Sequence, residues 1–192
     1  GTFGIGAGYS DADGFLGMVS VGDKNFRGTG DKVNVRWEFG GDSDNNKNYE
    51  FSYTRPWLDD KETSAGLTIY DMTNEYADYD HDGDEIARYD KQRRGQELTF
   101  SRRTNNEYVV NYLTLKNRDD IYKGVADGYE DSEQYFEVPG DLTLQEKRQK
   151  ENFGTTRSIG FTRAFDSRDN VNDPHEGKRN SYSIEWAGLG GD

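Results

Sequence analysis

A two-residue alternation along residues 1–39 limits the possible folds of this chain more than any other feature of its sequence. In the opening segment every second residue is apolar, and most of the intervening residues are glycine. The apolar positions are Phe3, Ile5, Ala7 and Tyr9, and the glycines are Gly4, Gly6 and Gly8. Strand side chains alternate between two faces, whereas a helical face needs apolar residues three and four positions apart. This stretch therefore predicts an antiparallel meander of extended strands.

The same alternation recurs along the rest of the chain and predicts an all-β protein of about nine strands. In the third segment, for example, Val33 and Trp37 lie on one face, with Arg36 on the other. The expected strands are Thr2–Tyr9, Phe15–Lys24, Lys32–Phe39, Asn48–Trp57, Thr63–Asp71, Gln96–Arg103, Glu107–Lys116, Thr155–Phe165 and Lys178–Ala187. In the eighth of these strands Arg163 interrupts the apolar face.

The composition excludes several classes of protein. Apolar residues make up only 31% of the 192 residues, which is too few for an ordinary soluble core, while aromatic residues reach 14%. The aromatic content and the regular period also argue against a disordered chain. The formal net charge of -13 makes nucleic acid an unsuitable partner. Because the sequence contains no cysteine, disulfides and thiolate metal sites are excluded.

The alternation and the connections favour a transmembrane β-barrel. No run approaches the roughly 18 apolar residues of a membrane helix, but a barrel strand needs only about ten alternating residues. One set of alternate connections is short and the other includes long acidic segments, as in outer-membrane barrels. We expect the two longest loops to be Met72–Gly95 and Asn117–Gly154. A soluble β-sandwich would show the same alternation, so it remains an alternative.

Four segments, in order, resemble the Omp85 superfamily of outer-membrane barrel proteins. The sequences are GFLGMVSVGDKNFRGTG (Gly14–Gly30), YTRPWL (Tyr53–Leu58), FDSRDNVNDPHEG (Phe165–Gly177) and the closing AGLGGD. Each segment includes residues suited to turns or strand ends, because glycine permits positive φ and proline cannot donate to a strand ladder. The residues that carry the resemblance are Asn25, Phe26, Gly28, Gly30, Pro56, Trp57, Asp166, Arg168, Asp169, Pro174 and Gly177.

The resemblance implies a sixteen-stranded up-and-down barrel in the outer membrane of a Gram-negative-type envelope, preceded by periplasmic POTRA domains. Residues 1–192 would then be the N-terminal half of the barrel, without the POTRA domains and the later strands. The implied function is to fold and insert other β-barrel proteins. The implied partners are client barrel proteins and the lipid bilayer, together with periplasmic chaperones and accessory lipoproteins.

The first strand is the candidate for a lateral gate. In the family, this strand pairs poorly with the last strand, and a client strand adds to the edge that opens. The candidate residues are Phe3, Gly4, Ile5, Gly6, Ala7, Gly8 and Tyr9. Each glycine raises the cost of ordering a strand by about 0.5–1 kcal/mol relative to alanine, so the pattern itself predicts a weakly held edge.

We expect neither catalysis nor a cofactor, because no nucleophile lies in a suitable context. One acidic run, Asp78, Asp80 and Asp82 followed by Gly83, matches the start of a calcium loop. The match then fails, because Tyr89 stands at the twelfth position in place of the bidentate glutamate. Two other functions stay open: a passive outer-membrane pore and a soluble calcium-binding β-sandwich adhesin.

Overall fold

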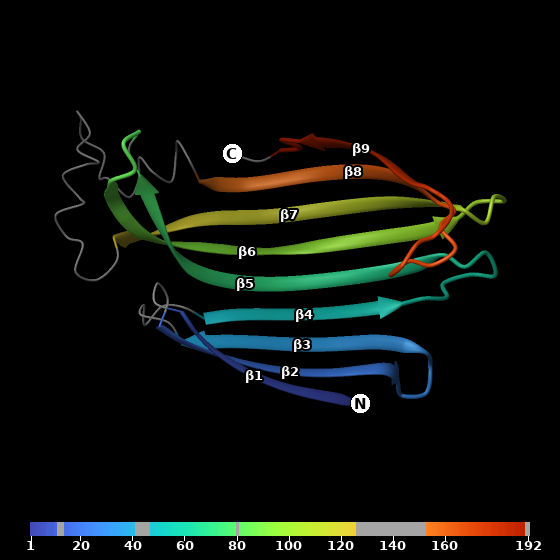
Figure 1. The fold of residues 1–192 in the computed structure, drawn as a ribbon, viewed down its shortest axis with the longest axis horizontal. Helices are drawn as coiled ribbons and strands as arrows, with labels where there is room; N and C mark the ends of the chain where they lie inside the picture. Colours follow the sequence, from blue (N-terminus) through green and yellow to red (C-terminus); the bar gives the residue numbers. More distant parts are fainter. Residues whose placement is uncertain (11–13, 41–46, 80, 126–152, 191–192) are drawn as a thin grey trace.

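In the computed structural model, nine antiparallel strands form a single open sheet in which each strand lies beside its sequence neighbours (Figure 1). The structure describes residues 1–10, 14–40, 47–79, 81–125 and 153–190. The strands are β1 (Thr2–Ser10), β2 (Gly14–Phe26), β3 (Asp31–Gly40), β4 (Lys47–Arg55), β5 (Ser64–Tyr79), β6 (Glu85–Arg103), β7 (Val109–Val125), β8 (Gly154–Asp166) and β9 (Arg179–Ala187). Among the described residues, no helix is long and apolar enough to cross a membrane.

The order of the strands confirms the predicted meander, but the two expected long loops are wrong in part. Strand β5 continues to Tyr79 and β6 begins at Glu85, so most of the segment 72–95 is a hairpin. Likewise, residues 117–125 belong to β7. Cross-strand pairs of polar and aromatic side chains extend these strands: Arg88 Nη1 lies 2.7 Å from Glu75 Oε1, and the rings of Tyr76 and Tyr89 stack. Apolar alternation does not report such pairs.

The two faces of the sheet differ sharply in character. Residues that are paired in register point to the same face. One face, called the outer face below, is apolar, and the other is called the inner face. One row of paired residues on the outer face consists of Leu67, Leu98, Leu115, Ile159 and Trp186. The principal contacts of each strand are with its neighbours along the sheet, and no second described sheet covers this apolar face. A two-layer sandwich therefore does not describe these residues.

The inner face carries polar residues that are linked by ion pairs. Asp120 on β7 is buried, and its carboxylate lies 2.7 Å from Arg93 Nε and 3.0 Å from Arg118 Nε. Nearby, Lys116 Nζ lies 3.6 Å from Glu185 Oε1, which connects β7 to β9. These contacts lie within β7, between β6 and β7, and across β8 from β7 to β9, on the face where the sequence predicts polar residues.

The apolar belt of the outer face runs diagonally across the strands. In β3 the belt extends from Val33 to Phe39, with its centre at the level of Arg36. The row of paired residues that contains Arg36 reaches β6 at Gly95, whereas the belt of β6 is centred four residues further along, at Thr99. Such a drift is expected when tilted strands share one horizontal membrane belt.

Candidate functional site: the first strand and the turn motifs

Strand β1 is an edge of the sheet. It pairs with β2 from Thr2 opposite Gly22 to Ser10 opposite Gly14, and β9 forms the opposite edge (Figure 1). In an antiparallel strand, alternate residues direct their N–H and C=O groups to opposite sides. Half of the backbone groups of β1 therefore point away from β2, and no described strand pairs with them.

The outer side chains of β1 are the most exposed part of the apolar belt near this edge. Ile5 is 73% exposed and Tyr9 is 75% exposed, whereas Val35, two strands further into the sheet, is 46% exposed. The difference arises because β1 has a neighbour on one side only. A further strand at this edge would cover these side chains as well as pair with the free backbone groups.

The three inner glycines of β1 meet different surroundings. A Cβ atom on Gly4 would lie 2.7 Å from Ser20 Oγ, and one on Gly6 would lie 3.3 Å from Met18 Cε. A Cβ atom on Gly8 would meet nothing within 4 Å. Close packing therefore does not require glycine at the third position, and the shared effect of the three is a strand with little side-chain contact on its inner face.

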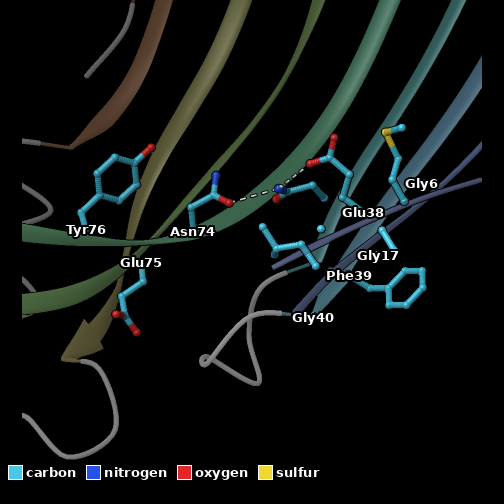
Figure 2. Close-up of a pocket in the computed structure, with 13 residues that line it drawn as sticks. Gly6, Gly17, Glu38, Phe39, Gly40, Asn74, Glu75 and Tyr76 are labelled. Atoms are coloured by element: carbon cyan, nitrogen blue, oxygen red, sulfur yellow. Dashed lines mark hydrogen bonds between the residues drawn. The ribbon is translucent and has the colours of Figure 1, made fainter. Parts of the chain in front are cut away.

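A hollow of about 640 Å³ lies beside this glycine face and is lined by residues of β1 to β5 (Figure 2). Its polar rim is held by Asn48, whose Nδ2 atom donates to Asn74 Oδ1 at 3.0 Å and to Glu38 Oε2 at 3.4 Å. Gly6 and Gly40 contribute only backbone to the wall. This wall carries hydrogen-bonding groups but no nucleophile paired with a base.

The first turn motif is built around Asn25. The backbone N–H of Gly28 donates to the Asn25 carbonyl at 3.0 Å, and the N–H of Gly30 donates to Asn25 Oδ1 at 2.7 Å. Both glycines have positive φ, +76° and +79°, which glycine adopts without a steric penalty. The Arg27 guanidinium lies 5.2 Å from the centre of the Phe26 ring. These contacts make a tight turn between β2 and β3.

The second motif ends β4 and presents an aromatic side chain. Pro56 follows the last residue of β4, and Trp57 is exposed. The turn is then closed by Asp59, which the sequence reasoning missed. Its Oδ1 atom accepts hydrogen bonds from the N–H groups of Lys61 at 2.9 Å and Thr63 at 3.1 Å. An aspartate shortly before a threonine at a strand end was the available signal, because such side chains commonly cap turns.

The third motif forms the turn between β8 and β9. Arg168 binds the Asp166 carboxylate with two hydrogen bonds, from Nε at 2.9 Å and from Nη2 at 2.7 Å. Asp169 instead accepts hydrogen bonds from the backbone N–H groups of His175 and Glu176, at 3.0 and 3.1 Å. Gly177 has φ of +98°, and a Cβ atom there would lie 2.2 Å from the Ser167 carbonyl oxygen. Pro174 lies within this turn.

These backbone donors also act on the electrostatics of the turn. The N–H groups of Glu176 and His175 hold the pKa of the Asp169 carboxyl below its ordinary value. At the turn between β4 and β5, hydrogen bonds from Thr63 likewise lower the pKa of Asp59. Both carboxylates therefore stabilise their turns in the charged form.

The acidic run considered for calcium is not assembled as a site in the described residues. Asp78 belongs to β5, Asp82 lies in the following turn, and Asp80 lies outside the described residues. In the described part of the chain, no three acidic or histidine side chains gather closely enough to hold a metal ion.

Comparison with known proteins identifies the architecture. The Omp85 superfamily domain matches residues 25–192. Among solved structures, the chain is similar to the crystal structure of BamA from Haemophilus ducreyi lacking POTRA domains 1–3, with 17% sequence identity and a TM-score of 0.66. The alignment covers 100% of this chain and 34% of that structure, so the chain spans about a third of its length. A search of curated proteins found no match.

Proposed function

Because this chain belongs to the Omp85 superfamily, we propose that it forms the first half of an outer-membrane barrel that folds and inserts other β-barrel proteins. The observation that carries the proposal is the glycine-rich strand β1 at an edge of the sheet, where backbone groups and apolar side chains both lack a neighbour among the described strands. The role is non-enzymatic and needs no cofactor. The residues involved are those of the glycine-rich edge, Phe3 to Tyr9.

The physics of the bilayer argues that this sheet needs further strands. Unpaired backbone groups in hydrocarbon cost several kcal/mol each, so strands cross membranes only in closed barrels. An open sheet with free edges at β1 and β9 therefore needs further strands, which the remaining length of the similar structure supports. We propose that POTRA domains and the later barrel strands belong to the same protein.

The proposed mechanism is strand addition at β1. An incoming client strand pairs its N–H and C=O groups with the free edge, and the paired backbone supplies most of the affinity. Gly4, Gly6 and Gly8 weaken the pairing of β1 with the last barrel strand, which forms the seam of the closed barrel. The reason is that each ordered glycine costs about 0.5–1 kcal/mol more than alanine. The seam can then open sideways into the membrane, where the bilayer receives the folded client.

A disulfide across the seam tests the proposal. In the full-length protein containing this chain, Ile5→Cys is combined with a cysteine at the facing position of the last barrel strand. Oxidation is expected to stop insertion of a client barrel into proteoliposomes, and reduction is expected to restore it. The native chain contains no cysteine, so the engineered pair forms without competition from this segment.

The matched control places the crosslink inside the chain. Ile5 and Val19 are paired residues of β1 and β2, so an Ile5→Cys, Val19→Cys pair uses the same first position without closing the seam. This variant is expected to insert clients normally when oxidised. Normal insertion with the seam disulfide fully formed would refute the gate and favour a passive pore.

A further inference from the structure

A row of polar residues crosses the outer face of the sheet near its turn end, the end at which short turns join β2 to β3, β4 to β5 and β6 to β7. Arg102 pairs in register with Asn111, and Asn111 pairs with Arg163, so the three side chains lie on one face. The adjacent row on the same face contains Phe100, Leu113 and Phe161. The two arginines therefore border the apolar belt directly.

Both guanidinium groups have donors to spare. Arg163 is exposed and forms no ion pair within the part of the chain that the structure describes. Arg102 has one loose contact, with Nη2 at 3.9 Å from Asp59 Oδ2, and Asp59 already accepts hydrogen bonds from its own turn. Asn111 Oδ1, between the two arginines, accepts no hydrogen bond from any described residue. The row therefore presents two positive charges, of which described residues pair only that of Arg102, through a single long contact.

The setting of this row is that of a membrane interface. Tyr182 continues the row on β9 and is 76% exposed, while Trp57 and Tyr108 are exposed at the same end of the sheet. Tryptophan and tyrosine favour the level of lipid headgroups, where one side of the ring is apolar and the other is hydrated. Short turns of outer-membrane barrels face the periplasm, so this level belongs to the periplasmic leaflet.

The opposite polar border of the belt differs in one important respect. There Arg157 lies in the row of Asn117 and Gln96, and its guanidinium is already engaged. Arg157 Nη1 donates to the Gly190 carbonyl at 2.6 Å, and Nε donates to Asn117 Oδ1 at 3.4 Å. Protein groups therefore satisfy the arginine at the loop end, whereas the arginines at the turn end remain available to an external anion.

We propose that Arg102 and Arg163 together bind the phosphate of a phospholipid in the periplasmic leaflet. Neighbouring strands are about 4.8 Å apart, so the two arginine backbones are separated by about 10 Å and can approach one phosphate from both sides of Asn111. Guanidinium groups bind phosphate through paired, charge-assisted hydrogen bonds. The acyl chains of this lipid lie against Phe100, Leu113 and Phe161. The site does not depend on the gate at β1.

Lipid retention by the full-length protein tests this site. The protein is incubated in detergent with phosphatidylglycerol, and bound lipid is measured by native mass spectrometry. In the double variant Arg102→Gln, Arg163→Gln, the bound fraction is expected to fall by about tenfold, because two charge-assisted contacts are lost. Undiminished retention in the folded double variant would overturn the proposal.

A neighbouring arginine provides the matched control. Arg103 is the next residue of β6, points to the opposite face, and pairs with Glu62 Oε2 at 3.3 Å. Arg103→Gln removes the same charge and is expected to leave lipid retention unchanged, so an equal loss in this variant would contradict a specific site. Displacement of the lipid by the same concentration of glycerol phosphate would show a site for free phosphate and would also overturn the proposal.

Folding of each variant is checked by the heat-dependent shift in gel mobility. If the double variant does not fold, the single variants Arg102→Gln and Arg163→Gln are compared with Arg103→Gln. Each of the two is expected to lose bound lipid relative to this control, and unchanged retention in both would refute the site.

Discussion

Glycine lies on the inner face of both β1 and β6, but for opposite physical reasons. Gly95 in β6 is buried, and a Cβ atom there would lie 2.4 Å from the Asn117 carbonyl oxygen and 3.0 Å from Tyr70 Oη. Gly8 in β1 has open space where a side chain would be. At Gly95 the absence of a side chain allows the strands to approach closely, whereas at Gly8 it only removes contacts. Glycine thus permits close packing in β6 and reduces side-chain packing in β1.

The interactions around these two strands follow the same division. At the loop end of β6 and β7, Tyr89, Tyr122 and Phe153 form an aromatic cluster with ring centres 5.8–6.4 Å apart. The buried Asp120 of β7 joins the two strands through Arg93 of β6, and it also pairs with Arg118 of its own strand. Strand β1 has mainly its pairing with β2 and an exposed apolar face. We therefore expect the sheet to have a firm centre and a loose margin.

The largest effect is expected from filling the space at Gly95. Gly95→Val forces carbon atoms against the β7 backbone, and overpacking of this kind costs about 3 kcal/mol. The midpoint of urea unfolding of the full-length protein, followed by heat-dependent gel mobility, should fall clearly. The control is Gly8→Val, which meets open space. An equal fall of the unfolding midpoint in both variants would contradict the proposed difference in packing between the centre of the sheet and its edge at β1.

A smaller loss is expected when the ion pairs of the centre are broken. Asp120→Asn leaves Arg93, Arg118 and Lys91, whose Nζ lies 3.8 Å from Asp120, without their shared carboxylate. Because the arginines are partly exposed, we expect a cost of about 2 kcal/mol, below that of a fully buried pair. Unfolding in urea measures the change. Glu38→Gln, near the margin, should cost less, and the reverse order would contradict the proposed division.

A local effect of pH is expected in the turn between β8 and β9. Hydrogen bonds from Glu176 and His175 lower the folded-state pKa of Asp169 below its ordinary value. The charged carboxylate therefore stabilises the turn above the unfolded pKa of about 3.9, and this contribution is lost as pH falls through the lower folded-state value. The rate of amide hydrogen exchange at residues 170–177 should rise in this pH range. Asp169→Asn should reduce the pH dependence and leave the part due to Asp166, whose pKa the Arg168 hydrogen bonds lower to about 2; an unchanged profile in this variant would contradict the prediction.

The smallest effect on stability is expected at Gly8. Gly8→Ala adds a methyl group in open space and removes conformational freedom from the unfolded chain, so it should stabilise β1 by about 0.5 kcal/mol. Hydrogen exchange of β1 amides should slow slightly. If the gate proposal is correct, client insertion should slow as well. Faster exchange in β1 would show that Gly8 serves the fold in some other way.

The sequence allowed the strand centres to be predicted, because alternation reports directly on two differently solvated faces. Alternation assigns Val33 and Trp37 to one face for this reason, and their register confirms the assignment. The extensions of β5, β6 and β7 could not be predicted in the same way. There, charge pairs such as Arg88 with Glu75 replace apolar alternation, and they become recognisable only when the partner strand is known.

The turn motifs and Arg163 illustrate a second limit. Glycines such as Gly28 predicted turns through their conformational freedom, and the φ values agree. Arg163 stood out in the sequence as an interruption of an apolar face. Its relation to Arg102, more than fifty residues away, depends on the register of three strands, which local patterns do not determine.

The diagonal belt has a consequence for any strand that joins this sheet. A drift of four residues across three strand spacings corresponds to a lean of about 40° from the membrane normal, since residues rise about 3.3 Å and strands are about 4.8 Å apart. A register slip of two residues at β1 would then move a newcomer's apolar side chains vertically by about 5 Å. The thickness of the bilayer therefore favours one register of the added strand over the registers that are shifted by two residues.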